Sequence, residues 1–255
     1  MALVAAAPAA AGERADFALG LDARAPGAPS AMTIHILYKA SGDPAAKPSP
    51  LRGVILDTPA GTRFVLDAVP ACTASDEQLK TQGPSACPAT SRVGAGTLTV
   101  MTGFGAPADP VRTNVTIFNS PGGFVEVVTD PSSGQPLGLD RARVEGSRAT
   151  LTPPFTPGGP PEGESAIRQI DLRFDVPAYV RTPAQCPGDG LWRSAGTFSF
   201  RDGVTVTEPA TTPCDVPAPA AVPPPRAARL VVRPGRLPAG RRKNLRLHVR
   251  HAAPG

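Results

Sequence analysis

The sequence predicts an all-β protein, an antiparallel β-sandwich or jelly roll with one short helix. Three observations predict this class. Short segments in which apolar and polar residues alternate recur along the whole chain. Turn-forming residues separate these segments, because 33 Pro and 26 Gly are far above average usage. Only one segment has the pattern of a helix.

The clearest strands are Met32–Tyr38 and 169–176, in which every even-numbered residue is apolar. The segment Leu191–Phe200 is followed by a tight turn at 201–203 and a second alternating segment at 204–207, which is a hairpin signature. Further strands are expected at 16–23, 52–58, 94–102, 111–119, 124–129, 141–145 and 148–152. About a dozen short strands at turn-spaced intervals are typical of a sandwich or jelly roll.

The helical pattern covers 75–82, where Ser75 is a suitable N-cap and acidic residues follow in the first turn. This segment lies between Cys72 and Cys87. A short helix enclosed by a disulfide is expected to be a structural cap.

Four cysteines permit three pairings. Their clustering favours the disulfides Cys72–Cys87 and Cys186–Cys214, each in a Pro- and Gly-rich stretch that a local crosslink would hold. The alternative is a four-cysteine metal site, which normally contains Cys-x-x-Cys pairs. Neither pair has that spacing.

The first 12 residues form a short, Ala-dominated apolar run that ends in small residues. We interpret residues 1–12 as the remnant of a truncated signal peptide; the alternative is a disordered Ala-Pro leader. No apolar run reaches the length of a transmembrane segment. The protein is therefore expected to be extracellular or associated with the cell wall.

A Pro- and Ala-rich linker is expected at 216–227, after a β-sandwich domain at 13–215. Residues 228–255 alternate like the opening hairpin of an immunoglobulin-like module, which suggests further domains after Gly255. Nine of the 26 basic residues follow Pro225 and all 21 acidic residues precede it. The predicted domain is thus net acidic, which argues against nucleic acid as a partner. The basic tail could lie on an anionic wall polymer or a membrane surface.

Two segments resemble an uncharacterised β-rich domain of secreted proteins from high-GC actinobacteria. One begins Cys87-Pro-Ala-Thr-Ser-Arg-Val-Gly, and the other runs from Cys186-Pro through Trp192 and Asp202-Gly to Cys214. Residues 230–249 similarly resemble the start of a bacterial immunoglobulin-like repeat. The resemblance implies export and a β-rich fold, but it passes on no activity and no site residue.

No catalytic, cofactor-binding or metal-binding residue is predicted. His35 falls on the polar face of its strand and no nucleophile elbow is present. Asp171 and Asp175 share the polar face of one strand with Arg173 between them, which is typical of a solvent-facing row of charges. Asp189 and Asp202 are expected to form turns.

Two functions therefore remain open. The first is a non-catalytic exported or cell-surface module for adhesion, spacing or ligand binding, with a cell-wall polymer or carbohydrate as a candidate partner. The second is a secreted carbohydrate-active or other hydrolytic domain, whose acids could include Asp140, Glu162 and Glu164. Two carboxylates across a cleft would favour the enzyme, and a flat sheet face without a deep pocket would favour the module.

Overall fold

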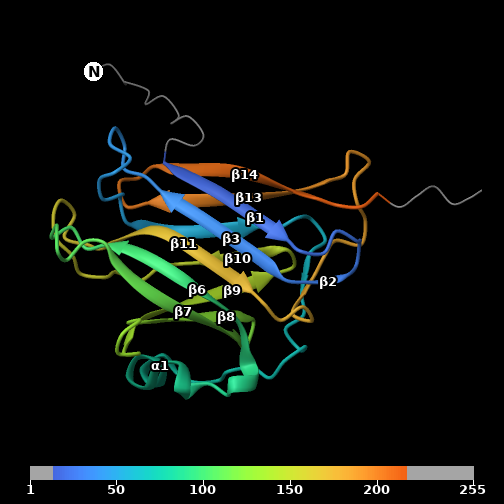
Figure 1. Cartoon of the computed structure of the whole chain (residues 1–255), viewed down its shortest axis with the longest axis horizontal. Coiled ribbons are helices and arrows are strands. Elements are labelled where there is room, and N and C mark those ends of the chain that lie inside the picture. The colour runs from blue at the N-terminus through green and yellow to red at the C-terminus, as the bar shows by residue number, and fades with distance from the viewer. Residues whose placement is uncertain (1–13, 217–255) are drawn as a thin grey trace, which may run out of the picture. The chain divides into compact units, whose positions relative to one another are not determined.

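A computed structural model describes residues 14–216 (Figure 1). These residues form one antiparallel sheet of 11 strands, a small sheet of three strands, one α-helix and two 3-10 turns. The predicted all-β class with one short helix is confirmed. The predicted signal remnant (1–12), the tail (228–255) and all but the first residue of the linker (216–227) lie outside the described residues.

The large sheet rolls up until its first and last strands are neighbours. In spatial order it contains β1 (Ala15–Leu21), β3 (Met32–Tyr38), β11 (Ala166–Phe174), β6 (Arg92–Met101), β7 (Val111–Ser120), β8 (Gly123–Thr129), β9 (Pro136–Glu145), β10 (Arg148–Leu151), β4 (Leu51–Asp57), β13 (Leu191–Phe200) and β14 (Thr205–Pro213). The Thr212 hydroxyl on β14 donates a hydrogen bond of 2.8 Å to the Leu19 carbonyl on β1. The two layers expected of a sandwich are therefore opposite sides of one continuous sheet.

Alternation along each strand decides which side chains fill the interior of the roll. Tyr38 on β3 meets Phe198 and Phe200 on β13 edge to face, with ring centroids 5.2 and 6.0 Å apart. All three side chains are fully buried. Only β1 and β14 separate β3 from β13 where the roll closes, so these contacts stabilise the closure from inside.

One end of the roll is closed. The small sheet, formed by β2 (Pro29–Ser30), β12 (Val180–Arg181) and β5 (Arg63–Phe64), lies at this end, to the right in Figure 1. Beside it, the ring of Phe124 packs edge to face on the ring of Phe174, with the centroids 5.1 Å apart. The ring of Tyr179 is parallel to that of Phe174, with the centroids 6.0 Å apart. The strands end at the opposite, left-hand end in loops that include 102–110 and 152–165.

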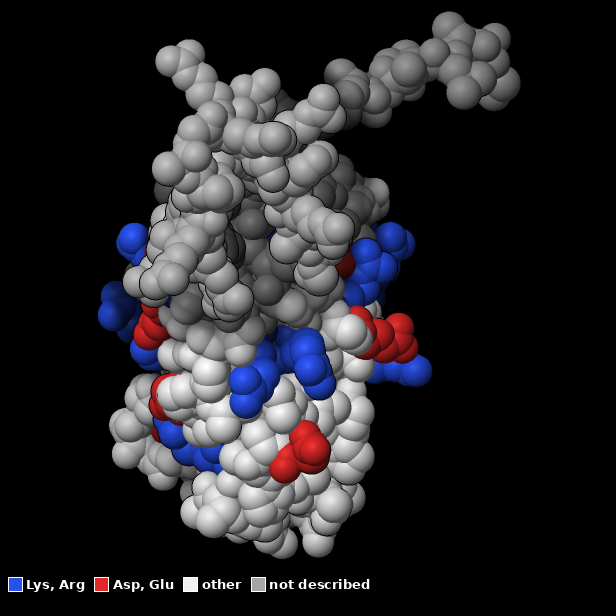
Figure 2. Space-filling view, turned by 90° about the vertical axis from the view of Figure 1, so that its right-hand side faces the viewer, with Lys and Arg blue, Asp and Glu red and all other residues white. Residues whose placement is uncertain are grey.

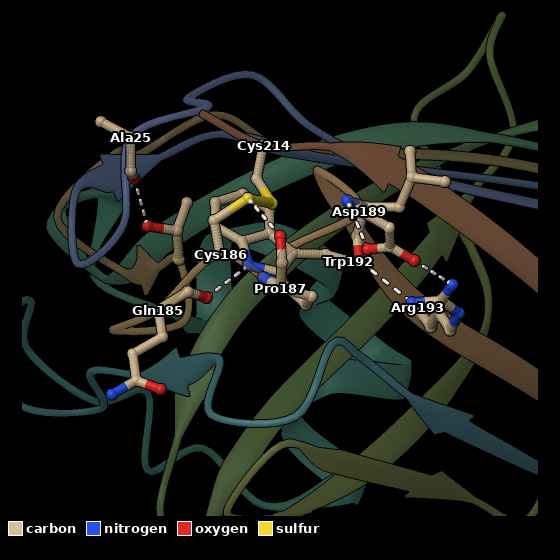
Figure 3. The surroundings of a disulfide bond; sticks show 10 residues. Ala25, Gln185, Cys186, Pro187, Asp189, Trp192, Arg193 and Cys214 are labelled. Atoms are coloured by element: carbon tan, nitrogen blue, oxygen red, sulfur yellow. Dashed lines mark hydrogen bonds and ion pairs between the residues drawn. A yellow bond between two sulfur atoms is a disulfide. The ribbon is translucent and has the colours of Figure 1, made fainter. Parts of the chain in front are cut away.

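The Cys186–Cys214 disulfide ties the end of β14 to the loop before β13 (Figure 3). The two Cα atoms are 5.7 Å apart. The Cys214 amide donates to the Gly190 carbonyl at 2.8 Å, and the Trp192 indole donates to the Gln185 carbonyl at 2.8 Å. The predicted pairing is confirmed.

The Cys72–Cys87 disulfide, with Cα atoms 5.1 Å apart, is confirmed as well. It encloses α1 (Asp76–Gln82) and the 3-10 turn Gly83–Ala86. The helix begins with a capping box between Ser75 and Gln78. A second 3-10 turn, Ala89–Ser91, follows the disulfide. Together they cover the outer face of β7, β8 and β9. The side chains buried there are Cys72, Leu79, Cys87, Phe118, Val125, Val127 and Leu139. The predicted structural cap is thus a second, smaller core outside the roll.

Candidate functional site

A cavity of about 300 Å³ lies inside the roll at its left-hand end. Aliphatic side chains and prolines make up most of its wall, including Leu51, Leu98, Val100, Val128, Pro153 and Ile167. This volume is at the lower end of the range of small-molecule sites. The cavity is apolar enough, and large enough, for one small apolar ligand.

The cavity opens where the wall of the roll is incomplete. β10 pairs only with Ala142–Glu145 of β9, so the earlier half of β9 has no strand neighbour on that side. Leu137 and Gly138 on β9 and Pro154 opposite them line the resulting gap. Leu137 and Phe155 beside it are 53% and 61% exposed. These two side chains make part of the rim apolar, and charged side chains, among them Lys80 and Arg141, line the hollow outside it.

Hydrogen bonds hold the loops around the opening in place. The Lys47 ammonium donates to the carbonyls of Gly159 and Glu164, at 3.2 and 2.6 Å, and forms an ion pair with Glu162. Asp109 accepts hydrogen bonds from Thr102 and from nearby backbone amides of the loop 102–105. Desolvation raises the pKa of Asp109, but these hydrogen bonds outweigh it and lower the pKa to about 2.

Two carboxyl groups border the interior of the roll, Glu126 buried and Asp140 partly exposed. Glu126 on β8 and Asp140 on β9 are directly opposite each other in the sheet register. Both line a smaller inner cavity of about 30 Å³, which shares Asp140, Leu98 and Ile167 with the larger cavity as wall residues. Glu126 is only 6% exposed, and Asp140 Oδ1 is buried without a hydrogen-bond partner among the described residues.

Burial changes the acidity of both groups. Desolvation raises the pKa of Asp140 to about 6. Desolvation, together with the nearby charge of Asp140, raises the pKa of Glu126 to about 8. Burial and the repulsion between the two carboxylates therefore disfavour the state in which both groups are ionised.

The cavities beside the pair offer no positive charge. No Lys, Arg or His is among the residues that line the two cavities. Tyr38, on the other side of the roll, has a buried hydroxyl without a hydrogen-bond partner in the part of the chain described. Burial, and secondarily the charge of Glu126, raises the pKa of this tyrosine well above its ordinary value. The two cavities are thus lined by acidic and neutral groups, whereas Lys80, Arg141 and Arg143 line a separate outer hollow that Asp140 also borders.

Of the three acids considered for a hydrolytic site, the structure brings two to the cavity. Asp140 lies on the unpaired half of β9 beside the opening, and the buried Glu164 lines the wall. Glu164 is paired with Arg201 at 3.3 Å, whereas Glu162 is bound to Lys47 at 2.9 Å. Glu164 and Glu162 thus each have a cationic partner.

The outer face of β11 carries the predicted row of charges. Asp171 binds His35 at 2.6 Å, Arg173 binds Asp22, and Asp175 binds Arg92. The His35 side chain is 47% exposed, as its position on the polar face predicts. The His35–Asp171 pair is not apparent from the sequence, because it depends on the pairing of β3 with β11.

Asp189 and Asp202 occupy turns, as predicted. Asp189 accepts a hydrogen bond from the Leu191 amide and pairs with Arg193, and Asp202 accepts one from the Val204 amide and pairs with Arg14. Within residues 14–216, no group of three or more His, Cys, Asp or Glu side chains is placed to hold a metal ion.

Sequence reasoning missed Glu126. The signal for it is a single carboxylate in the otherwise apolar run Phe124-Val-Glu-Val-Val128, where every residue is buried. A charged residue in a strand that is buried on both faces is unusual, and it indicates a functional group or an internal partner. The unpaired half of β9, which forms the opening, was also missed, because the predicted strand begins only at Arg141.

No family model, no curated protein and no solved structure matches the chain. No described helix has the length and hydrophobicity needed to cross a membrane. At the end of the molecule opposite the cavity, Figure 2 shows basic and acidic side chains interspersed, without a large continuous area of either sign. The cavity is therefore the feature that points most directly to a function.

Proposed function

We propose that the protein is a non-catalytic exported or cell-surface module whose rolled sheet binds an apolar small molecule. The observation that carries this proposal is the aliphatic cavity of about 300 Å³ with a partly apolar opening beside β9. The two disulfides indicate an oxidising compartment, which supports an extracellular or wall-associated location. A flat face without a deep pocket would have favoured a module for spacing or adhesion, whereas the cavity favours ligand binding.

A cell-wall polymer or carbohydrate fits this cavity less well than an apolar molecule does. Sugars are usually held by many hydrogen-bonding groups and by aromatic rings, whereas the residues lining the main cavity include no aromatic side chain. The bound molecule is therefore expected to be mainly aliphatic, or a compact apolar ring system.

The direct test is uptake of N-phenyl-1-naphthylamine, an uncharged fluorescent probe of apolar cavities. Gly138 faces the cavity, and a Cβ atom built there would meet no atom within 4 Å. Gly138→Leu should therefore fill the cavity without strain and reduce probe binding at least tenfold. Gly188→Leu adds the same bulk at another open glycine outside the cavity and should leave binding unchanged. Absence of probe binding to the wild-type protein would refute the proposal.

The hydrolytic alternative is favoured by one observation, the pair of carboxyls whose pKa values are pushed apart. In that reading, the Asp140 carboxylate would accept a proton from an attacking water and the protonated Glu126 would donate one to the leaving group. The two groups, however, sit side by side on neighbouring strands and not across a cleft. Turnover of 4-nitrophenyl octanoate that Asp140→Asn abolishes, with probe binding retained, would support the enzyme.

A further inference from the structure

We propose that the cavity recognises an apolar amine, whose single ammonium group is held by Asp140 and Glu126 while its hydrocarbon part fills the aliphatic cavity. This inference rests on the proposed binding function and specifies the chemical class of the ligand. It is carried by three features of the described residues: the position of the carboxyl pair, its lack of internal partners, and the charge of the lining.

The position of the pair suits a ligand with a polar end and an apolar body. Asp140 borders both the larger cavity and the inner one, while Glu126 borders only the inner one. Asp140 lies on the unpaired half of β9 that forms the opening, so a ligand could place its polar end there while its hydrocarbon part extends into the aliphatic cavity. The inner cavity of about 30 Å³ has room for roughly one water-sized group, which is the size of an ammonium.

The carboxyl pair lacks the partners that a purely structural role would require. A buried carboxylate is costly unless it is paired or hydrogen-bonded. Asp140 Oδ1 nevertheless has no hydrogen-bond partner among the described residues. Glu126 is 6% exposed, and the other residues that line the inner cavity with it and Asp140 are all apolar. Glu164, the other acid of the lining, already has Arg201 as a partner. A ligand ammonium would supply the missing counter-ion.

The charge of the cavity lining disfavours ligands whose polar group is anionic or neutral. Carboxylates are the only ionisable groups that line the two cavities, so an anionic group inside them, such as that of a fatty acid, would be repelled; Lys80, Arg141 and Arg143 line only the outer hollow. A neutral alcohol could accept or donate one hydrogen bond but would leave the charge of Asp140 uncompensated. A cationic end would supply the positive charge that the lining of the two cavities lacks.

The test compares three probes of equal chain length, octylamine, 1-octanol and octanoate, by displacement of N-phenyl-1-naphthylamine from the full chain at pH 7. Octylamine should bind roughly 10- to 100-fold more tightly than 1-octanol, as expected for a charge-assisted hydrogen bond, and octanoate should bind most weakly. Asp140→Asn should reduce octylamine to the affinity of 1-octanol and leave 1-octanol unchanged. Asp171→Asn, which removes a carboxylate from the outer face of β11, should preserve the preference.

Acid should abolish the preference as well. Protonation of Asp140 below about pH 6 would remove its charge, so octylamine should lose affinity there while 1-octanol should not. Equal affinity of the wild-type protein for octylamine and 1-octanol would overturn the amine inference but would leave the binding function intact. Failure of all three probes and of the fluorescent probe to bind would overturn both.

Discussion

Glu126 is expected to make the folded protein less stable as the pH rises. Its pKa is about 8 in the folded protein and 4.5 ordinarily, so between these values the folded state holds a proton that the unfolded state has released. The free energy of unfolding should therefore fall between pH 4.5 and 8, by up to about 1.4 kcal/mol per pH unit for one group. Asp140, whose pKa is raised from 3.8 to about 6, adds to this loss below pH 6.

Glu126→Gln tests this pH dependence. The variant cannot ionise at this position, so its stability should change little between pH 6 and 8, and it should exceed that of the wild type at pH 8. The measurement is urea unfolding at several pH values. Parallel pH profiles for variant and wild type would show that another group dominates.

The side-chain amide of Asn119 on β7 is expected to hold the segment 66–70 against the sheet by hydrogen bonds. It is 1% exposed, and its side-chain nitrogen donates to the carbonyls of Leu66, Val69 and Pro70 at 2.8, 3.0 and 3.4 Å. Asn119→Ala would leave these acceptors without their donor and should cost about 1–3 kcal/mol of stability in urea unfolding. Asn114→Ala, at an exposed position of the same strand, is the matched control and should cost much less.

The close pairing of β6 with β11 requires glycine at position 96, as it also does at position 94. A Cβ atom at position 96 would lie 2.0 Å from the Asp171 carbonyl oxygen, too close for any side chain without movement of the backbone. Gly96→Ala should therefore destabilise the protein by about 1–3 kcal/mol. Gly53→Ala on β4, where the nearest atom would be 3.9 Å away, should be tolerated. Thermal unfolding of the two variants provides the comparison, and equal melting temperatures would contradict the close approach of the strands.

The element that forms the opening shows a limit of local patterns. Residues 141–145 alternate clearly enough to be predicted as a strand, whereas Pro136–Asp140 begin with a proline and include a glycine, both of which are poor strand formers. Pairing with β8 over Gly123–Thr129 recruits these residues into the sheet. The position of Asp140 in the cavity follows from that pairing and not from its own sequence neighbourhood.

The two disulfides should affect different parts of the molecule. In the chain-entropy model, loops of 15 and 28 residues are worth about 3–4 kcal/mol each when crosslinked. Replacing Cys186 and Cys214 by Ala should increase hydrogen exchange at the end of β14, beside β1. Replacing Cys72 and Cys87 should increase exchange in α1 and leave the cavity able to bind the fluorescent probe. Loss of probe binding in the second variant would show that the helix supports the cavity.

The sequence was sufficient for the properties that depend on near neighbours. Strict alternation predicted β3, β11 and the β13–β14 hairpin, the capping residues predicted α1, and the spacing of the cysteines predicted both disulfides. Tertiary structure alone decided that one sheet rolls until β14 meets β1, that β10 is too short to close the wall beside β9, and that Glu126 and Asp140 face each other inside. The reason is physical: strand propensity acts over a few residues, whereas register, closure and a shared cavity depend on pairing between segments that are distant in the chain.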